Sequence, residues 1–448
     1  MRKDRPPGPR GFGPNIRALR GLTSDPCPAL DELVRTHGPS FVVGGGPLRI
    51  AVVGDPLHLG PLLAASTDAF RWGHRFNVLG FIVGPTSIIV SDGEDHRRRR
   101  AAVQPAFARR RLDACVPTMI GETDRIVAEL ASADDGLPVD LYEVGRTLVR
   151  RIVVRVLFGS DFGEQADLLG ELLEPAMQYG VQPALRQVPH RVPHTRRARA
   201  RDALRAADSV IYDEIARRRG RARGDSSDVL DALFDAGDSL SDREVRDQVI
   251  TLIAAGYDTT ASGLAWTVLR AAGTPGLWDA LRTEADEVLG AAGASACDGA
   301  VVRRLTNADA VVRETLRLHP PGVFSPRQAE RDIELDRLMI RKGTMILWSP
   351  YVAGRLPQVW HDPLAFRPDR FVAADPLQQA AIDGAWLPFG RGPRSCIGFG
   401  LAQMELTAVL ARLTQTIDVD LVHAAIPKPV GMIVNRPEGG VMASVTRR

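Results

Sequence analysis

The stretch Phe389-Gly390-Arg391-Gly392-Pro393-Arg394-Ser395-Cys396-Ile397-Gly398 says more about this chain than any other segment. It places Phe, Gly, Arg, Cys and Gly at the spacing F-x-x-G-x-R-x-C-x-G. The glycines let the backbone turn tightly and approach a flat group, and Arg394 can pair with a carboxylate. Cys396 lies directly before a predicted helix that begins at Phe399, where backbone N–H groups can stabilise a thiolate. The alternative is a free cysteine in a glycine-rich turn.

Length and composition indicate one large globular protein. The 448 residues are 44% hydrophobic and 25% charged, which is ordinary for such proteins, and no linker or internal repeat divides them. A net charge of +3 argues against a nucleic-acid binder. The four cysteines include no C-x-x-C pair, so we expect neither a disulfide framework nor a structural zinc site. No apolar run follows the charged start or could span a bilayer later, so we expect a cytoplasmic protein without a membrane anchor.

The helical pattern covers most of residues 94–290. Ser241 and Glu244 form a capping-box pattern that predicts the start of a long helix. That helix is expected to end at Gly273. Residues 220–228 are polar and predict a loop, followed by a short apolar helix up to about residue 236. Helix therefore dominates the expected secondary structure.

Strands are expected in three places. Two β-branched runs around a Gly/Pro turn predict a hairpin at residues 41–53, followed by a helix with Asp55 at its N-cap. Alternating apolar residues predict a second hairpin between 332 and 347 that turns at 341–343. A third small β element is expected from residues 432–434 and 441–445. The fold class is therefore mainly α with small β-sheets.

The expected long helix contains the segment Ala255-Gly256-Tyr257-Asp258-Thr259-Thr260. Glycine inside a helix costs about 1 kcal/mol relative to alanine, which indicates a close approach or a local opening. The hydroxyl of Thr259 can bond back to the carbonyl of Ala255, and Asp258 supplies an acid able to relay protons. The alternative is an ordinary buried helix with a satisfied threonine.

Two charged patterns accompany these segments. Glu314 and Arg317 stand at i,i+3 on one helix face and can pair, and Arg370 follows in Pro368-Asp-Arg-Phe371. His96 and Arg100 stand at i,i+4 in the basic run of residues 92–100, so both can reach carboxylates on one side. A solvated basic run is the alternative for the second pattern.

Together, and in the order in which they occur along the chain, these motifs resemble those of cytochrome P450. The resemblance begins at about residue 30. It implies one large P450-like catalytic domain over residues 30–448, preceded by an extension without a membrane anchor over residues 1–29.

The resemblance also implies the cofactor and the residues that hold it. The cofactor is haem b, with the Cys396 thiolate as the iron ligand. His96, Arg100, Arg327 and Arg394 are expected to bind the haem propionates. The resemblance assigns Glu314, Arg317 and Arg370 to a network that supports the cysteine loop. The other implied haem-binding residues are Phe389, Gly390, Gly398, Ala255 and Gly256.

The implied reaction is monooxygenation. A thiolate ligand favours O–O bond cleavage, and the two protons this needs are assigned to Asp258 and Thr259 with water. One oxygen atom of O2 would enter a hydrophobic small molecule by hydroxylation or epoxidation. The P450-like region uses up the chain, so the electrons are expected from a separate ferredoxin or flavodoxin-type donor with its reductase. Residues 97–99 are expected to face solvent, where their arginines could steer an acidic donor. The family default is a monomer.

The implied substrate pocket is mostly apolar, which favours a fatty acid, terpenoid, steroid or polyketide. Any of its residues can instead belong to the core. Residues 183–201, dense in Pro, His and Arg, are expected over the entrance, where their charges could meet a carboxylate or merely face water. The expected pocket residues, besides Ala255, are Phe76, Leu79, Phe81, Ile82, Val83, Val323, Phe324, Met432 and Ile433.

Two other functions stay open. A non-catalytic haem sensor or electron carrier would need the cysteine loop but not Asp258 and Thr259. A P450-fold enzyme could also perform phenol coupling, C–C cleavage or desaturation, and no sequence feature separates these reactions from hydroxylation.

Overall fold

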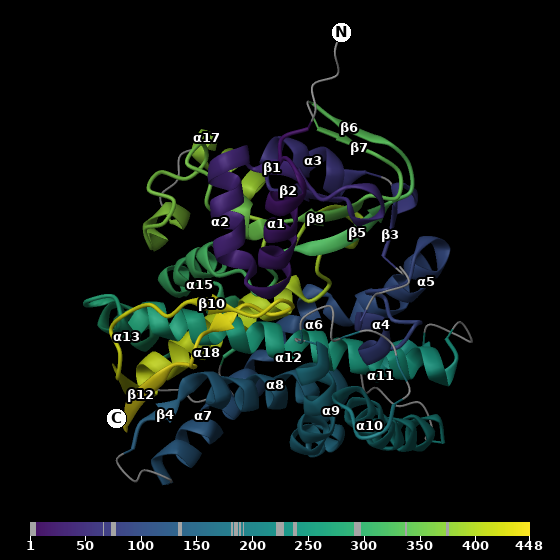
Figure 1. The fold of residues 1–448 in the computed structure, drawn as a ribbon. Coiled ribbons are helices and arrows are strands. Elements are labelled where there is room, and N and C mark those ends of the chain that lie inside the picture. Colours follow the sequence, from purple (N-terminus) through teal and green to yellow (C-terminus); the bar gives the residue numbers. More distant parts are fainter. Residues whose placement is uncertain are drawn as a thin grey trace.

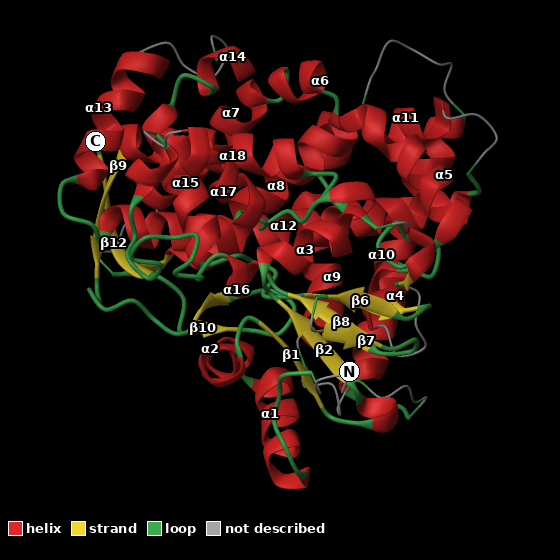
Figure 2. Cartoon of the chain, turned by 90° about the horizontal axis from the view of Figure 1, so that it is seen from above, coloured by secondary structure: helices red, strands yellow, loops and turns green. Residues whose placement is uncertain are grey.

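The fold was obtained as a computed structural model (Figure 1). Seen from above, one group of strands lies near helices α1 (Phe12–Ser24) and α2 (Pro26–His37), a smaller group lies apart from it, and helices fill most of the rest (Figure 2). The mainly α fold class with small sheets is therefore confirmed. The structure describes residues 6–65, 67–72, 78–132, 137–180, 182, 187, 190, 192–220, 228–235, 240–290, 297–336, 338–372 and 376–448.

The long helix α12 (Asp242–Ala272) runs through the middle of the molecule (Figure 1). The capping box is confirmed: Glu244 N donates to Ser241 Oγ at 3.3 Å, and Ser241 N donates to Glu244 Oε2 at 3.0 Å. Gly273 caps the other end, as predicted. Most of its residues are buried, because an apolar helix is stable only when protein covers it on all sides.

Other long helices pack around α12 and form the larger hydrophobic core. Helix α8 runs beside α12 in Figure 1, and α15 and α18 also contact it. These helices are α7 (Val116–Ser132), α8 (Leu141–Gly163), α9 (Ala166–Gly180), α10 (Arg196–Arg219), α13 (Leu277–Leu289), α15 (Thr306–Leu318) and α18 (Phe399–Thr416).

A five-stranded sheet forms the other side of the molecule, in the order β1-β2-β8-β5-β3. The hairpin predicted at residues 41–53 is confirmed, since β1 and β2 pair antiparallel. Asp55 caps the following helix by accepting from Leu57 N at 3.0 Å. The elements are β1 (Ser40–Val43), β2 (Ile50–Val53), β3 (Phe70–Arg71), β5 (Ser325–Ala329), β8 (Met345–Trp348), α1 (Phe12–Ser24), α2 (Pro26–His37) and α3 (Pro56–Ala64).

The second hairpin exists, but its predicted turn was wrong. Strands β6 (Ile333–Leu335) and β7 (Leu338–Ile340) pair antiparallel, so the chain turns around Asp336, which adopts φ 45°. Aspartate tolerates this left-handed conformation better than most residues. Residues 341–343 instead lead into β8, which joins the five-stranded sheet. The alternation of apolar residues alone could not show that residues 345–348 pair with β2 and β5 and not with β7.

The prediction of the third β element was half right. Strand β12 (Met442–Arg447) pairs with β9 (Ile417–Leu421) and β4 (Val139–Asp140). Residues 432–434, however, form no strand and connect β10 (Pro429–Val430) to β11 (Arg436–Pro437). The adjoining Asn435 carbonyl accepts hydrogen bonds from Ser262 and Trp266 of α12, so side chains of the helix hold this segment.

Short helices complete the chain. The apolar helix predicted before residue 236 is α11, while residues 221–227 of the predicted loop lie outside the described part. Within the described residues, none of the helices is both long and apolar enough to cross a membrane. The short helices are α4 (Val78–Val83), α5 (Gly93–Val103), α6 (Arg109–Asp113), α11 (Val229–Asp235), α14 (Gly299–Val302), α16 (Pro350–Ala353) and α17 (Pro376–Ala385).

Candidate active site

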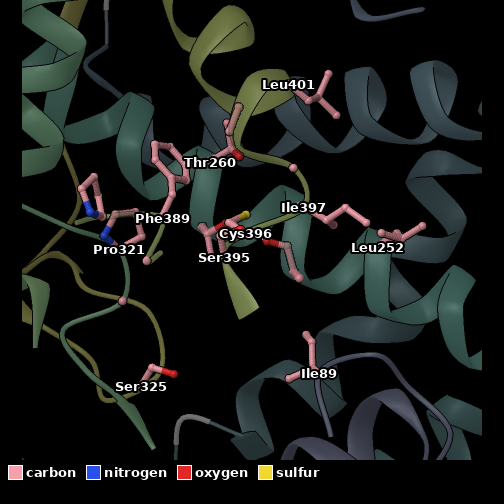
Figure 3. Close-up of a pocket in the computed structure, with 18 of the residues that line it drawn as sticks. Ile89, Leu252, Thr260, Pro321, Ser325, Phe389, Ser395, Cys396, Ile397 and Leu401 are labelled. Carbon is pink, nitrogen blue, oxygen red and sulfur yellow. Dashed lines mark hydrogen bonds between the residues drawn. The ribbon is translucent and has the colours of Figure 1, made fainter. Parts of the chain in front are cut away.

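The Cys396 thiol faces a large internal cavity. Figure 3 shows its sulfur between Phe389 and Ile397, with Leu252 of α12 further along the cavity. The backbone N–H of Cys396 donates to the Phe389 carbonyl at 2.8 Å, which closes the loop. The side chain is exposed to this cavity. Protein packed behind the sulfur raises the pKa of the Cys396 thiol, while the Gly398 N–H and the Arg100 cation lower it.

Two glycines shape the loop before the cysteine. Gly390 and Gly392 adopt φ 66° and 74°, which few other residues tolerate. A Cβ on Gly392 would also lie 2.2 Å from the Leu63 carbonyl oxygen. Gly398 differs, since its φ is −85° and a Cβ there would meet only ordinary contacts. The tight turn predicted from the sequence therefore lies at Gly390 and Gly392.

Helix α12 lines the same cavity with Ala255, Gly256, Thr259 and Thr260. The hydroxyl of Thr259 donates to the Ala255 carbonyl at 2.6 Å, which confirms the back-bond predicted from the sequence. A Cβ on Gly256 would lie 3.1 Å from Val153 of α8, so glycine permits close helix packing here. The thiol and a stretch of α12 that carries a hydroxyl thus share one cavity.

Basic groups gather at one edge of the cavity. Arg100 Nη1 donates to the Ser395 carbonyl at 3.0 Å, and Arg394 Nη2 donates to the Ser91 carbonyl at 2.6 Å. Arg394 and Arg327 both lie against the Trp72 ring, 3.8 and 5.0 Å from its centroid. His96, Arg100 and Arg394 line the cavity, whereas Arg327 lies beside it, behind Trp72.

These groups are charged or polar but incompletely paired. Burial, followed by the nearby Arg394 cation, lowers the pKa of Arg327 to about 9 and that of His96 to about 3. Burial also lowers the pKa of Arg394 to about 10, although Asp92 lies 3.4 Å away. Arg327 Nε, Arg394 Nε and His96 Nδ1 are buried without a hydrogen-bond partner among the described residues. Such an arrangement suits an anionic ligand.

The predicted support network is a buried cluster. Arg317 Nε and Nη2 donate to the two carboxylate oxygens of Glu314 at 2.7 and 2.8 Å. Arg370 Nε donates to the same carboxylate at 3.2 Å, and Arg367 N does so at 2.8 Å. Arg317 also donates to the carbonyl of Pro363 at 2.7 Å. The cluster therefore joins α15 to the segment that precedes the cysteine loop.

Asp258 does not face the cavity, although its neighbour Thr259 does. It lies on the side of α12 toward α8, where Tyr142 donates to its Oδ1 at 3.4 Å and Arg146 Nε lies 3.6 Å away. Arg146 also pairs with Glu174 of α9. Burial raises the pKa of Asp258, while the Arg146 cation acts in the opposite direction.

Comparison with known proteins decides the family. The model of the cytochrome P450 family matches residues 6–442. The chain belongs to the cytochrome P450 family. It is 35% identical over 392 residues to the putative cytochrome P450 139 of Mycobacterium tuberculosis, which covers 86% of each chain. Cyclooctatin synthase of Streptomyces melanosporofaciens is 34% identical over 336 residues, 73% of this chain and 71% of that one.

A solved structure shows the shared fold. Cyanobacterial CYP120A1, with retinoic acid bound, matches 99% of both chains with a TM-score of 0.85 and 22% identity. Membership of the family makes this chain a haem-thiolate monooxygenase with haem b as cofactor, and implies O2, a substrate and a redox partner. The residues of the site fit that cofactor. The thiol lies at one wall of the cavity, and unpaired buried N–H groups at its edge suit the two propionates.

The structure places the residues predicted for the P450 substrate pocket in two groups. Phe324 lines the cavity together with Ala255. Val323 is instead 1% exposed in the core beside the five-stranded sheet. The lining does not include the described residues Leu79, Phe81, Ile82, Val83, Met432 and Ile433. Phe76 lies outside the described part of the chain.

Sequence reasoning missed several residues of the cavity. Trp72 and Trp348 line it, and the buried Trp348 Nε1 has no hydrogen-bond partner among the described residues. Glu405 of α18 also lines it, with both carboxylate oxygens buried and unpartnered among these residues. The signal for Glu405 was its place on the helix after the cysteine. The tryptophans gave no local signal, because only the fold brings them to the cavity.

One expected solvent-facing arginine is buried. Arg97 is exposed and pairs with Glu94, but the Arg99 side chain is only 7% exposed. Arg99 Nε donates to Glu244 of α12 at 3.0 Å, and Arg98 pairs with the same carboxylate. Arg99 therefore fastens α5 to the start of α12, a contact that a local charge run cannot reveal.

Proposed function

We propose that this P450 inserts one oxygen atom of O2 into an apolar small molecule, using electrons from a ferredoxin or flavodoxin-type donor. The observation that carries the proposal is one cavity lined by both the Cys396 thiol and Thr259. A haem sensor needs no hydroxyl at that position. The other walls are largely apolar and include Ile88, Ile89 and Leu252.

Cys396 would be the iron ligand, and the basic edge would hold the propionates. Haem with a thiolate ligand supplies O–O bond cleavage and an oxidant for C–H bonds. The Gly398 N–H and Arg100 favour the thiolate form of Cys396. His96, Arg100, Arg327 and Arg394 would each donate N–H groups to carboxylates, which supports this assignment. Phe389 and Gly390 shape the loop that carries the Cys396 thiol.

Asp258 and Thr259 would deliver protons to the cavity. Asp258 holds a proton more readily than an exposed carboxyl, because burial raises its pKa. Its carboxylate accepts from Tyr142 and forms an ion pair with Arg146, both on the side of α8, so it must turn, or use water, to reach Thr259. The Thr259 hydroxyl already lies at the cavity wall and can pass a proton inward.

The electron donor would dock beside the cysteine loop. Arg109 and Arg110 are exposed at the start of α6, two and three residues after Phe107. Phe107 itself lies close to Gly398, since a Cβ on that glycine would be 3.9 Å from its ring. Arg97 adds a further exposed cation on α5. Clustered cations steer acidic partners, and acidic ferredoxins or flavodoxins would fit.

Isotope labelling tests the reaction. A library of apolar compounds is screened by the change in the haem absorption band, and hits are turned over with a ferredoxin, its reductase and ¹⁸O₂. We expect one ¹⁸O atom in the product. A product without label would favour desaturation or phenol coupling. If the donor reduces the haem but none of the compounds that bind is converted to a product, a haem sensor would be favoured.

A further inference from the structure

The sequence of residues 181–201 is rich in positive charge. They include six arginines and two histidines but no aspartate or glutamate, although the whole chain has a net charge of only +3. The second half of this segment opens α10, whose first turn has no acidic residue and begins with Arg196 and Arg197. Helix N-termini favour anions, so cations there oppose the helix dipole. Such placement costs stability unless an anion binds.

Arg197 packs against two aromatic side chains. Its guanidinium lies 4.0 Å from the centroid of the Phe81 ring and 5.5 Å from that of Tyr179. Nη1 donates to the Tyr179 hydroxyl at 2.9 Å. The two rings meet edge-on, with centroids 5.4 Å apart. This aromatic clamp fixes the position of Arg197 and leaves it half-buried.

The clamp leaves the charge of Arg197 unpaired. Guanidinium has five N–H donors, and the bond to Tyr179 uses one of them. Among the described residues, Arg197 has neither a second hydrogen bond nor a carboxylate within ion-pair distance. The nearby Asp202 instead pairs with Arg201 and Arg205. A rigid cation without an anion is thus held on two aromatic rings.

The clamp residues Phe81, Tyr179 and Arg197 do not line the P450 cavity, but the chain after α4 links the clamp to that lining. Phe81 belongs to α4, which both views place close to α9 and α10 (Figures 1 and 2). Its neighbour Ile82 touches Gly180 at the end of α9, since a Cβ there would lie 2.8 Å from Ile82 Cδ1. The chain then crosses α12, where Thr86 bonds to Asp247, and reaches Ile88, which lines the cavity.

We propose that Arg197 binds the carboxylate of an amphipathic substrate whose apolar body extends into the cavity. This inference rests on the proposed function and narrows its substrate class to long apolar acids. The apolar walls of the cavity would hold the chain, and the clamp would hold the head. Charge-assisted bonds to a fixed guanidinium are stronger than neutral ones, and pre-positioning by Phe81 and Tyr179 lowers the entropy lost on binding.

Paired ligands and paired variants test the proposal. Tetradecanoic acid and its methyl ester are titrated into the haem-loaded protein, followed by the haem absorption band and by calorimetry. The matched control for Arg197→Gln is Arg199→Gln, because Arg199 is exposed on the same turn of α10. We expect Arg197→Gln to weaken binding of the acid about tenfold and that of the ester less than about threefold. Arg197→Lys should restore part of the loss.

Several results would overturn the proposal. If the unchanged protein bound the acid and the ester equally well, no cation would be binding the carboxylate. Equal losses in Arg197→Gln and Arg199→Gln would indicate diffuse attraction, as at an anionic membrane or an acidic carrier protein. The carbon monoxide spectrum of each variant separates this failure from failure of the proposed function, because it reports the thiolate-ligated haem without substrate.

Discussion

Glu314→Gln should destabilise this P450 strongly. The side chain of Glu314 has no exposed surface, and its carboxylate accepts from Arg317, Arg370 and the backbone of Arg367. Glutamine keeps the shape but removes the charge, so two buried cations lose their counter-ion. Breaking a buried pair costs about 3–5 kcal/mol. We expect the lower end, about 3 kcal/mol, because Arg317 keeps its bonds to backbone carbonyls.

Denaturant unfolding followed by circular dichroism measures this loss. The matched control is Glu94→Gln, which breaks an exposed pair with Arg97 of the same i,i+3 spacing. Exposed pairs contribute far less to stability than buried ones, because water and salt screen them. Haem content after gel filtration should also fall in Glu314→Gln, since the cluster holds the segment before the cysteine loop. If both variants lost the same small amount of stability, the cluster would not have its assigned structural role.

Three further changes have distinct expected outcomes. Arg100→Ala should lower haem content after gel filtration while Arg97→Ala should not, and equal content would contradict the propionate role. Thr259→Ala should consume O2 and electrons with product reduced about tenfold or more; Thr259→Ser should recover the product, and full coupling in the alanine variant would refute the relay. Burial raises the pKa of Glu405 well above its usual range. Above about pH 4.3 the unfolded chain therefore releases a proton that the folded protein keeps. The free energy of unfolding contributed by this group falls as the pH rises beyond that point. Glu405→Gln should therefore match the unchanged protein near pH 5 and exceed it in unfolding free energy at about pH 8, and parallel pH curves would contradict a protonated Glu405.

The sequence predicts those parts of the site that short spacing determines. The Cys396 loop, the Thr259 back-bond and the Glu314–Arg317 pair each depend on neighbours within a few residues. Helix caps at Ser241 and Asp55 follow for the same reason. Interactions between residues close in sequence are therefore enough to predict these elements.

Long-range packing decides what the sequence did not predict. Trp72 reaches the cavity because β3 pairs with β5, and Arg99 is buried because α12 brings Glu244 to it. Asp258 turns toward Arg146 of α8, which lies 112 residues earlier in the chain. A side chain's face on a long buried helix depends on all of its neighbours. The apolar pattern alone could not show that Leu79, Phe81, Ile82 and Val83 of α4 do not line the cavity.

The absorption spectrum of the reduced protein with carbon monoxide tests the central claim most directly. Cys396→Ser is compared with Cys115→Ser, whose thiol bonds to the Arg111 carbonyl and does not line the cavity. We expect a strongly red-shifted Soret band in the unchanged protein and in Cys115→Ser, and its loss in Cys396→Ser. A red-shifted band that survived in Cys396→Ser would show that Cys396 is not the iron ligand.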